Sequence, residues 1–201
     1  MRRLLLSLSA SPLTSESDCV IISLRKEMMV MTRFRDAMPG DAMLISRLFA
    51  ASWRVAYQGI VPQHYLDRLP DEYWLPTVRA WLMSGCFSAV LAFEGDTAVG
   101  CVIFGRGRDE AYADWGEIVS LYLLPEHMRR GIGTALMQRA LEAMRADSYS
   151  RFYLWAIKGN SAADQFYHKL GFHLTEETVD YKIGGGDVRD IRYVLEESSP
   201  S

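Results

Sequence analysis

A segment rich in glycine and arginine, residues 125–136 (PEHMRRGIGTAL), stands where a strand should end and a helix should begin. The start of a helix offers unpaired backbone N–H groups and the positive end of the helix dipole, and both favour anions. Gly131 and Gly133 carry no side chain, so a phosphate can approach the backbone closely. Arg129 and Arg130 add positive charge beside them. The segment therefore predicts a binding site for a phosphorylated ligand.

Two common phosphate-binding patterns do not fit this segment. A P-loop requires a lysine and then serine or threonine after the second glycine, whereas Gly133 is followed by Thr134 and Ala135. A dinucleotide-binding fingerprint requires a third small residue at the position of Leu136. A glycine-containing turn with solvated arginines is the structural alternative, and this segment alone leaves it open.

A second patterned segment lies downstream, at residues 155–172 (WAIKGNSAADQFYHKLGF). Its sequence predicts the end of a buried strand, a loop and a helix that Gly171 ends. Its recurring elements are Asn160, the small residue Ala163, the pair Phe166–Tyr167 and the pair Gly171–Phe172.

The two segments, in this order, resemble motifs A and B of the GNAT superfamily of N-acetyltransferases. Motif A has the pattern Q/R-x-x-G-x-G/A after a strand that ends near a proline, and its marked positions fall on Met128, Gly131 and Gly133. Met128 departs from the expected Gln or Arg, which removes one side-chain contact but leaves the backbone contacts. The resemblance extends from about Thr32 to Leu195 and is to small bacterial-type members.

The resemblance implies an enzyme that transfers the acetyl group of acetyl-CoA to a primary amine of a small molecule or peptide, by direct attack in a ternary complex. The pantetheine arm would lie along residues 121–123 and the pyrophosphate at residues 129–134. Near 120–124 the strand would separate from its neighbour, so that a backbone N–H could hold the thioester oxygen. The implied cofactor-binding residues are Leu121, Tyr122, Leu123, Arg129, Arg130, Gly131, Ile132, Gly133, Thr134 and Asn160.

Glu117 is the candidate general base. It begins the run Glu-Ile-Val at residues 117–119, which matches the catalytic-glutamate position of the histone acetyltransferase branch. A strand-end glutamate in solvent or in a salt bridge is the structural alternative, and Asp114 or Glu110 could serve as the base instead. Regular strand alternation would put four side chains on one face, directing the carboxylate to the acyl end: Glu117, Val119, Leu121 and Leu123.

Tyr167 is the candidate general acid for the CoA thiolate, because the resemblance matches it to that position. A tyrosine packed in the core is the structural alternative, as a plain helix N-cap is for Asn160. Trp53 and Tyr57 are candidates for the amine acceptor site, because aromatic faces can hold a cation. The acceptor could be a polyamine, an amino acid, an antibiotic or a protein N-terminus. A non-catalytic sensor of acyl-CoA is the alternative function.

The elements that position these residues alternate between strand and helix patterns, which predicts an α/β fold. The GNAT fold implies a central mixed, mostly antiparallel twisted sheet of about seven strands with helices on both faces. Trp74 and Trp81 share a helix face and are expected in the core. Strands are expected at 32–37, 88–93, 98–104, 117–124, 151–157, 172–183 and 187–195, and helices around 41–49, 74–82, 132–144 and 161–170, with an aromatic-rich connection at 53–66.

Composition narrows the remaining functions. The net charge of −3 and the lack of a basic run argue against nucleic-acid binding, and no apolar run is long enough for a membrane span. The 3 cysteines and 4 histidines do not cluster, so no metal site is expected, and Cys86 and Cys101 should be buried.

We expect a cytoplasmic protein, and the resemblance allows a homodimer. Residues 1–30 are expected to be a disordered extension or a mis-assigned start, residues 31–196 a single N-acetyltransferase domain, and residues 197–201 a polar tail.

Overall fold

The computed structural model describes residues 31–197, in which seven strands form one mixed sheet. The strands are β1 (Thr32–Asp36), β2 (Phe87–Glu94), β3 (Thr97–Arg106), β4 (Gly116–Leu123), β5 (Arg151–Ile157), β6 (His173–Ile183) and β7 (Gly186–Glu196). Their order in the sheet is β1-β2-β3-β4-β5-β7-β6. Every neighbouring pair is antiparallel except β4 and β5, which are parallel. The expected mixed, mostly antiparallel sheet is confirmed.

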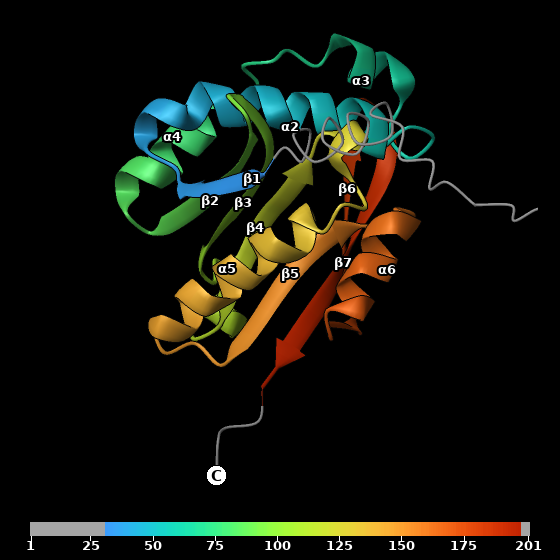
Figure 1. Cartoon of the computed structure of the whole chain (residues 1–201). Helices are drawn as coiled ribbons and strands as arrows, with labels where there is room; N and C mark the ends of the chain where they lie inside the picture. Colours follow the sequence, from blue (N-terminus) through green and yellow to red (C-terminus); the bar gives the residue numbers. More distant parts are fainter. Residues whose placement is uncertain (1–30, 198–201) are drawn as a thin grey trace, which may run out of the picture. The chain divides into compact units, whose positions relative to one another are not determined.

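Helices cover both faces of this sheet (Figure 1). The α-helices are α2 (Ala42–Ala56), α3 (Gln63–Arg68), α4 (Leu75–Ser84), α5 (Ile132–Ala146) and α6 (Ser161–Lys169), and short 3-10 helices lie at Pro39–Asp41, Glu110–Tyr112 and Pro125–His127. α2 and α4 pack on one face in a cluster that includes Phe49, Val78 and Ile103. α5 and α6 pack on the opposite face in a cluster that includes Leu136 and Tyr167.

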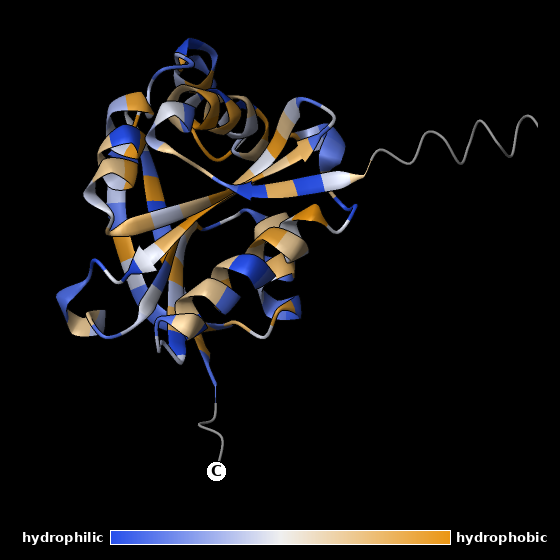
Figure 2. Cartoon of the chain, turned by 60° about the vertical axis from the view of Figure 1, so that its left-hand side comes forward, coloured by the Kyte–Doolittle hydropathy of each residue, from blue (hydrophilic) through white to orange (hydrophobic). Residues whose placement is uncertain are grey.

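α5, which follows the glycine segment, is amphipathic. Figure 2 shows hydrophobic and hydrophilic residues alternating along the helices, as burial of one side requires. Gly131, the N-cap of α5, has a φ of 83°, a left-handed conformation that favours glycine. The side chains that hold α5 against the sheet are Ile132, Leu136, Met137, Ala140, Leu141 and Met144.

The segment after the first expected helix differs from the sequence-based prediction. Trp53 was expected in a connection but lies in the last turns of α2, and Tyr57 is the C-cap of that helix. The short helix α3, which follows Pro62, was not expected. It has six residues and buries only Leu66, so it is too short to show a helical period.

The expectation for Cys86 was wrong, whereas that for Cys101 is confirmed. Cys86 is exposed because it follows Gly85, which ends α4 at the surface with a φ of 70°. Cys101 is fully buried in β3. Trp74 and Trp81 pack against the cluster beneath α2 and α4, as expected for core residues.

The ends of the chain lie at residues 1–30 and 198–201. The expectations for residues 1–30 and 198–201 lie outside the described residues. Glu197, the first residue of the expected tail, is described and forms an ion pair with Arg145 of α5 (Nε–Oε2 2.9 Å). None of the helices between residues 31 and 197 has the length and hydropathy needed to cross a bilayer. The domain boundaries at 31 and 196 stay a prediction.

Candidate active site

The two parallel strands of the sheet separate part of the way along their length. β4 and β5 pair only where Gly116, Glu117 and Ile118 face residues 152–154, although β4 continues to Leu123 and β5 to Ile157. Beyond Ile118, the edge of β4 that faces β5 therefore has no strand partner within the described chain. We call this divergence, formed by residues 119–123 and 155–157, the fork. It lies where the family resemblance implies that the strands separate.

A β-bulge in β4 lies at the base of the fork. The register with β3 shifts between Ile118 and Ser120, so that Val119 is an extra residue. Val119 packs toward α2 and α4, whereas Leu121 packs toward α5. A bulge changes which face the following side chains occupy. The prediction of one shared face is therefore wrong for Glu117, Val119, Leu121 and Leu123.

The glycine segment forms a cradle of backbone at the start of α5. Arg129 has a φ of 59° and Gly131 a φ of 83°, so two of the three residues before the helix are left-handed. Such turns gather N–H groups into a concave anion site. A Cβ at Gly131 would meet no atom within 4 Å, whereas a Cβ at Gly133 would lie 3.4 Å from Leu123 Cδ1. Open space therefore lies beside the cradle, next to the end of β4.

The two arginines of the cradle differ in their partners. The Arg130 guanidinium binds Glu94, with Nη2 2.7 Å from Oε1, and the same carboxylate lies 3.1 Å from His127 Nδ1. Arg129 has no ion-pair partner among residues 31–197. Arg129 is thus the arginine whose charge is available to an anion at the cradle.

Tyr167 lies on α6, which packs against the same face of the sheet as α5. Its side chain is buried against the rings of Phe166, Phe172 and Tyr193. Burial raises the pKa of Tyr167 well above its usual value, and the neighbouring Tyr122 and Tyr193 add to the effect. The hydroxyl therefore keeps its proton at neutral pH, as a proton donor requires.

Asn160 acts as the N-cap of α6. Its Oδ1 accepts a hydrogen bond of 3.1 Å from the N–H of Ala163. This contact matches the structural alternative and fixes the loop between β5 and α6. A contact of Asn160 with pantetheine stays a prediction.

Glu117 is held in a dense hydrogen-bond arrangement. Only 1% of the residue is exposed. Its Oε2 accepts hydrogen bonds from Arg108 N (3.1 Å), Arg108 Nε (2.9 Å) and Tyr153 Oη (3.0 Å), and its Oε1 accepts one from Arg108 Nη2 (2.6 Å). These bonds raise the pKa of Arg108, and burial raises that of Tyr153 to about 12. In this arrangement both oxygens of the Glu117 carboxylate are held by hydrogen bonds.

The other candidate carboxylates lie at the surface. Asp114 is exposed and forms an ion pair with Arg151, and Glu110 is exposed in a 3-10 helix. Neither contacts Glu117 or Tyr167 through a hydrogen bond found in the described chain. The same part of the chain has no group of three metal-ligating side chains close enough to hold a metal ion.

An aromatic cluster with one carboxylate lies beside the fork. The hydroxyls of Tyr57 and Tyr122 are 3.4 Å apart, and the Trp53 ring lies 4.6 Å from that of Tyr57. Tyr181 donates a hydrogen bond of 2.9 Å to Asp190. Trp53 and Tyr57 are the predicted acceptor candidates and Tyr122 a predicted cofactor-binding residue, whereas no sequence pattern marks Tyr181 or Asp190. The structure brings all five together from α2, β4, β6 and β7.

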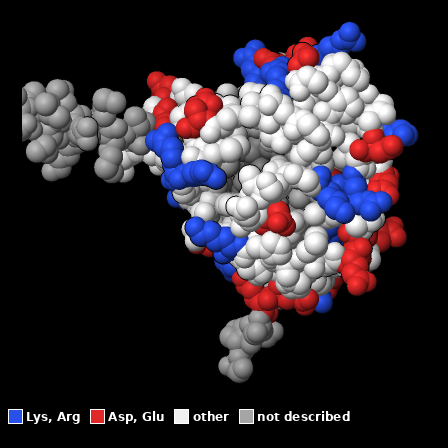
Figure 3. Space-filling model, turned by 90° about the vertical axis from the view of Figure 1, so that its right-hand side faces the viewer, with Lys and Arg blue, Asp and Glu red and all other residues white. Residues whose placement is uncertain are grey.

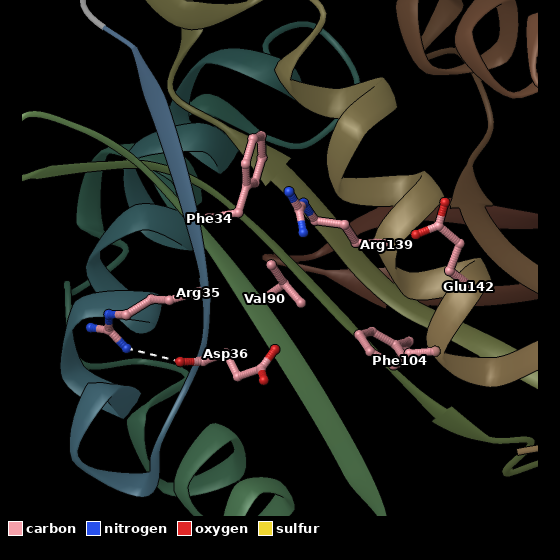
Figure 4. A pocket seen from close by; sticks show the side chains of 8 residues that line it. Phe34, Arg35, Asp36, Val90, Phe104, Arg139 and Glu142 are labelled. Atoms are coloured by element: carbon pink, nitrogen blue, oxygen red, sulfur yellow. Dashed lines mark hydrogen bonds between the residues drawn. The ribbon is translucent and has the colours of Figure 1, made fainter. Parts of the chain in front are cut away.

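A surface cavity of about 360 Å³ lies elsewhere, between β1 and α5 (Figure 4). The Arg139 guanidinium lies 4.5 Å from the centre of the Phe34 ring there, and Arg35 pairs with Asp41. This cavity includes none of the predicted catalytic or cofactor-binding residues. The cavity is therefore separate from the fork.

Known proteins with similar sequences are acetyltransferases. The sequence matches the profile of the acetyltransferase (GNAT) family over residues 49–172. It is 30% identical over 171 residues to a probable N-acetyltransferase, Rv2775, of Mycobacterium tuberculosis, covering 84% of this chain and 95% of that protein. It is 25% identical over 126 residues to the spermidine N(1)-acetyltransferase of Thermoplasma acidophilum, covering 62% of this chain and 78% of that protein.

A solved structure shares the fold. The crystal structure of the PaiA N-acetyltransferase from Thermoplasma acidophilum, in complex with coenzyme A, superposes with a TM-score of 0.66. The match covers 83% of this chain and 99% of that one at 21% identity. At this identity the likeness shows a common architecture.

Proposed function

The chain belongs to the acetyltransferase (GNAT) family, and from that premise we propose that the fork between β4 and β5 is its active site. The enzyme transfers the acetyl group of acetyl-CoA to an amine. The location of the active site is supported by the path of β4 beyond its last residue paired with β5. The strand leaves β5 after Ile118 and ends at Leu123, next to the phosphate cradle of α5.

The residues present fit acetyl-CoA. Open space beside Gly131 and the free charge of Arg129 suit a pyrophosphate, with Ile132, Gly133 and Thr134 completing the first turn of α5. The unpaired edge of β4 at residues 121–123 suits an extended pantetheine arm that needs main-chain partners. When bound, acetyl-CoA supplies an acetyl thioester, an activated acyl group.

Two parts of the chain stabilise charge during the transfer. A backbone N–H on the free edge of β4 holds the carbonyl oxygen as negative charge develops, and a preorganised donor of this kind contributes about 3 kcal/mol. Tyr167 gives its proton to the leaving thiolate, since burial keeps its hydroxyl neutral. General acid help of this kind is worth about 10²- to 10⁴-fold in rate.

Glu117 is the proposed acceptor of the amine proton, through a water molecule. The side chain of Arg108 is 47% exposed, whereas that of Glu117 is 2% exposed. Arg108 can therefore turn toward solvent and free Oε1 while Glu117 stays in place. Tyr153 keeps the carboxylate oriented during this exchange.

The acceptor is a primary amine of a small molecule or peptide. A relative named for spermidine supports a cationic amine, and Trp53 and Tyr57 offer aromatic faces beside the fork. A cytoplasmic location is part of this proposal, because Cys86 and Cys101, the cysteines within residues 31–197, are both free. A homodimer stays a prediction.

The test is release of CoA thiol from acetyl-CoA, measured with spermidine, short peptides, amino acids and arylamines in turn. Double-reciprocal plots of the initial rate, at several concentrations of each substrate, should give intersecting lines, because direct attack needs both substrates bound together. Parallel lines would indicate an acetylated enzyme intermediate and contradict direct attack. Binding of acetyl-CoA without amine-dependent release would favour a non-catalytic sensor instead.

A further inference from the structure

Asp190 occupies a defined place relative to the fork. It lies on β7, opposite Ile157, the last residue of β5, and opposite Val179 of β6. β4 and β5 are paired only at the other end of β5, around Leu154. Asp190 therefore lies at the open end of the fork, where β5 has already left β4.

Asp190 has no cation to neutralise it within residues 31–197. The only hydrogen bond to its carboxylate found there comes from Tyr181 Oη, at 2.9 Å. Arg192, two residues along the same face of β7, is already paired with Asp109 and Glu177. Burial raises the pKa of Asp190, which the hydrogen bond from Tyr181 only partly offsets. A partly buried carboxylate without a cation is costly unless a ligand supplies the charge.

A cluster of aromatic side chains lies beside this carboxylate. Tyr57, Trp53, Tyr122 and Tyr181 belong to a single hydrophobic cluster that also contains Ile157. The buried indole N–H of Trp53 lies toward the Tyr122 hydroxyl, and this contact partly offsets the effect of burial on the pKa of Tyr122. Aromatic faces attract alkylammonium groups.

The cluster is electrostatically linked to the candidate general acid. Burial is the main cause of the raised pKa of Tyr122, and the charge of Asp190 adds to it. Tyr122 in turn adds to the raised pKa of Tyr167, after burial. Tyr122 is thus close enough to interact with both Asp190 and Tyr167, and Asp190 lies on β7 opposite Ile157 at the open end of the fork.

We propose that Asp190, with the aromatic groups of Trp53, Tyr57, Tyr122 and Tyr181, forms the subsite that binds the cationic group of the acceptor, so that the enzyme prefers alkylammonium acceptors to uncharged or anionic amines. This rests on the proposed function, because the subsite belongs to the same fork. Figure 3, which views the side of the molecule where α6 and β6 lie, shows a hollow in a broad uncharged area with charged side chains mostly around it. A partly buried carboxylate beside aromatic side chains selects for a cation.

Asp190→Asn tests the proposal, with Asp187→Asn as the matched control. Asp187 is on the same strand but is exposed and paired with Lys182 at the hairpin. With spermidine as the acceptor, Asp190→Asn should raise KM by about 10- to 100-fold, as loss of a desolvated charge partner does. The Kd for acetyl-CoA and the KM for an arylamine, uncharged at neutral pH, should stay within about threefold. Tyr181→Phe should raise the KM for spermidine less, and Asp187→Asn should not change it.

The outcomes separate this inference from the proposed function. An unchanged KM for spermidine in Asp190→Asn, or an equal loss with the arylamine, overturns the subsite and leaves acetyl transfer standing. Calorimetric titration of spermidine into the protein with CoA present gives a readout that does not depend on turnover. If wild type binds spermidine through Asp190 but acetylates no amine, the subsite holds and the proposed function fails.

Discussion

Arg108 and Glu117 form a bidentate ion pair in which one partner is buried and the other is half exposed. Nη2 lies 2.6 Å from Oε1 and Nε lies 2.9 Å from Oε2, while the exposed fractions of the two side chains are 47% and 2%. Because of this asymmetry, only the Arg108 side chain can turn into solvent while the protein stays folded. Arg108 thus holds the Glu117 carboxylate in place but can be released from it.

Stability should respond unequally to the two halves of this pair. Arg108→Gln leaves the buried Glu117 carboxylate without its cation and should lower the free energy of unfolding by about 3 kcal/mol. Glu117→Gln leaves an arginine that solvent can receive and should cost about 1 kcal/mol. Urea denaturation of both variants measures the difference. Equal losses of unfolding free energy in the two variants would show that an unpaired buried charge at Glu117 has no special cost.

The phosphate cradle can be tested with two glycines that share a strained backbone. Gly131→Ala and Gly85→Ala both place a Cβ at positive φ, 83° and 70°, with no atom within 4 Å. Each should therefore cost about 1 kcal/mol of stability. Only Gly131→Ala should weaken acetyl-CoA binding, by about tenfold or more, since only its methyl group enters the cradle. Calorimetric titration checks this, and similar Kd values for the two variants would argue against the cradle.

The two cradle arginines should contribute differently to cofactor binding. Arg129→Gln should raise the Kd for acetyl-CoA by about tenfold, because its charge is free to meet a phosphate. Arg130→Gln should raise it by less than about threefold, because Glu94 already neutralises Arg130. Salt titrations should show the weaker ionic-strength dependence in Arg129→Gln. The reverse order would mean that Glu94 releases Arg130 when the ligand binds.

Asp190 should reduce stability at the pH where it is ionised. Its folded-state pKa is raised, chiefly by burial, so its contribution to stability is greatest below the unfolded pKa and is lost as pH rises through the folded pKa. Asp190→Asn should therefore melt at a higher temperature than wild type at pH 8. The gap should shrink as pH falls through the pKa of Asp190. A lower melting temperature at pH 8 would mean that the carboxylate stabilises the fold.

The parts of the site that depend on nearby residues could be predicted from the sequence. Gly131, Tyr167 and Asn160 lie in short segments whose spacing carries the motif, and the structure places them at the start of α5 and on or before α6. The fork could be expected because the family resemblance located it near residues 120–124. Helical and strand periods also predicted nearly every strand and long helix.

The parts that depend on distant contacts could not be predicted. Asp190 and Tyr181 join Tyr57 and Tyr122 from four separate elements, and alternation along β7 alone does not say what its side chains meet. The bulge at Val119 follows from the pairing of β4 with β3, and no residue in the run marks it. The ion pair that holds Glu117 depends on a loop residue, Arg108, with no recognisable pattern.

The most direct test of acetyl transfer at the fork is a single-turnover measurement with Tyr167→Phe. Tyr149→Phe is the control, because Tyr149 packs partly buried against the same core cluster but has no role in the site. The chemical step of Tyr167→Phe should be slower than wild type by about 10²- to 10⁴-fold. The Kd for acetyl-CoA and the melting temperature should be unchanged, and Tyr149→Phe should react at the wild-type rate. A Tyr167→Phe variant that transfers acetyl as fast as wild type would contradict the account.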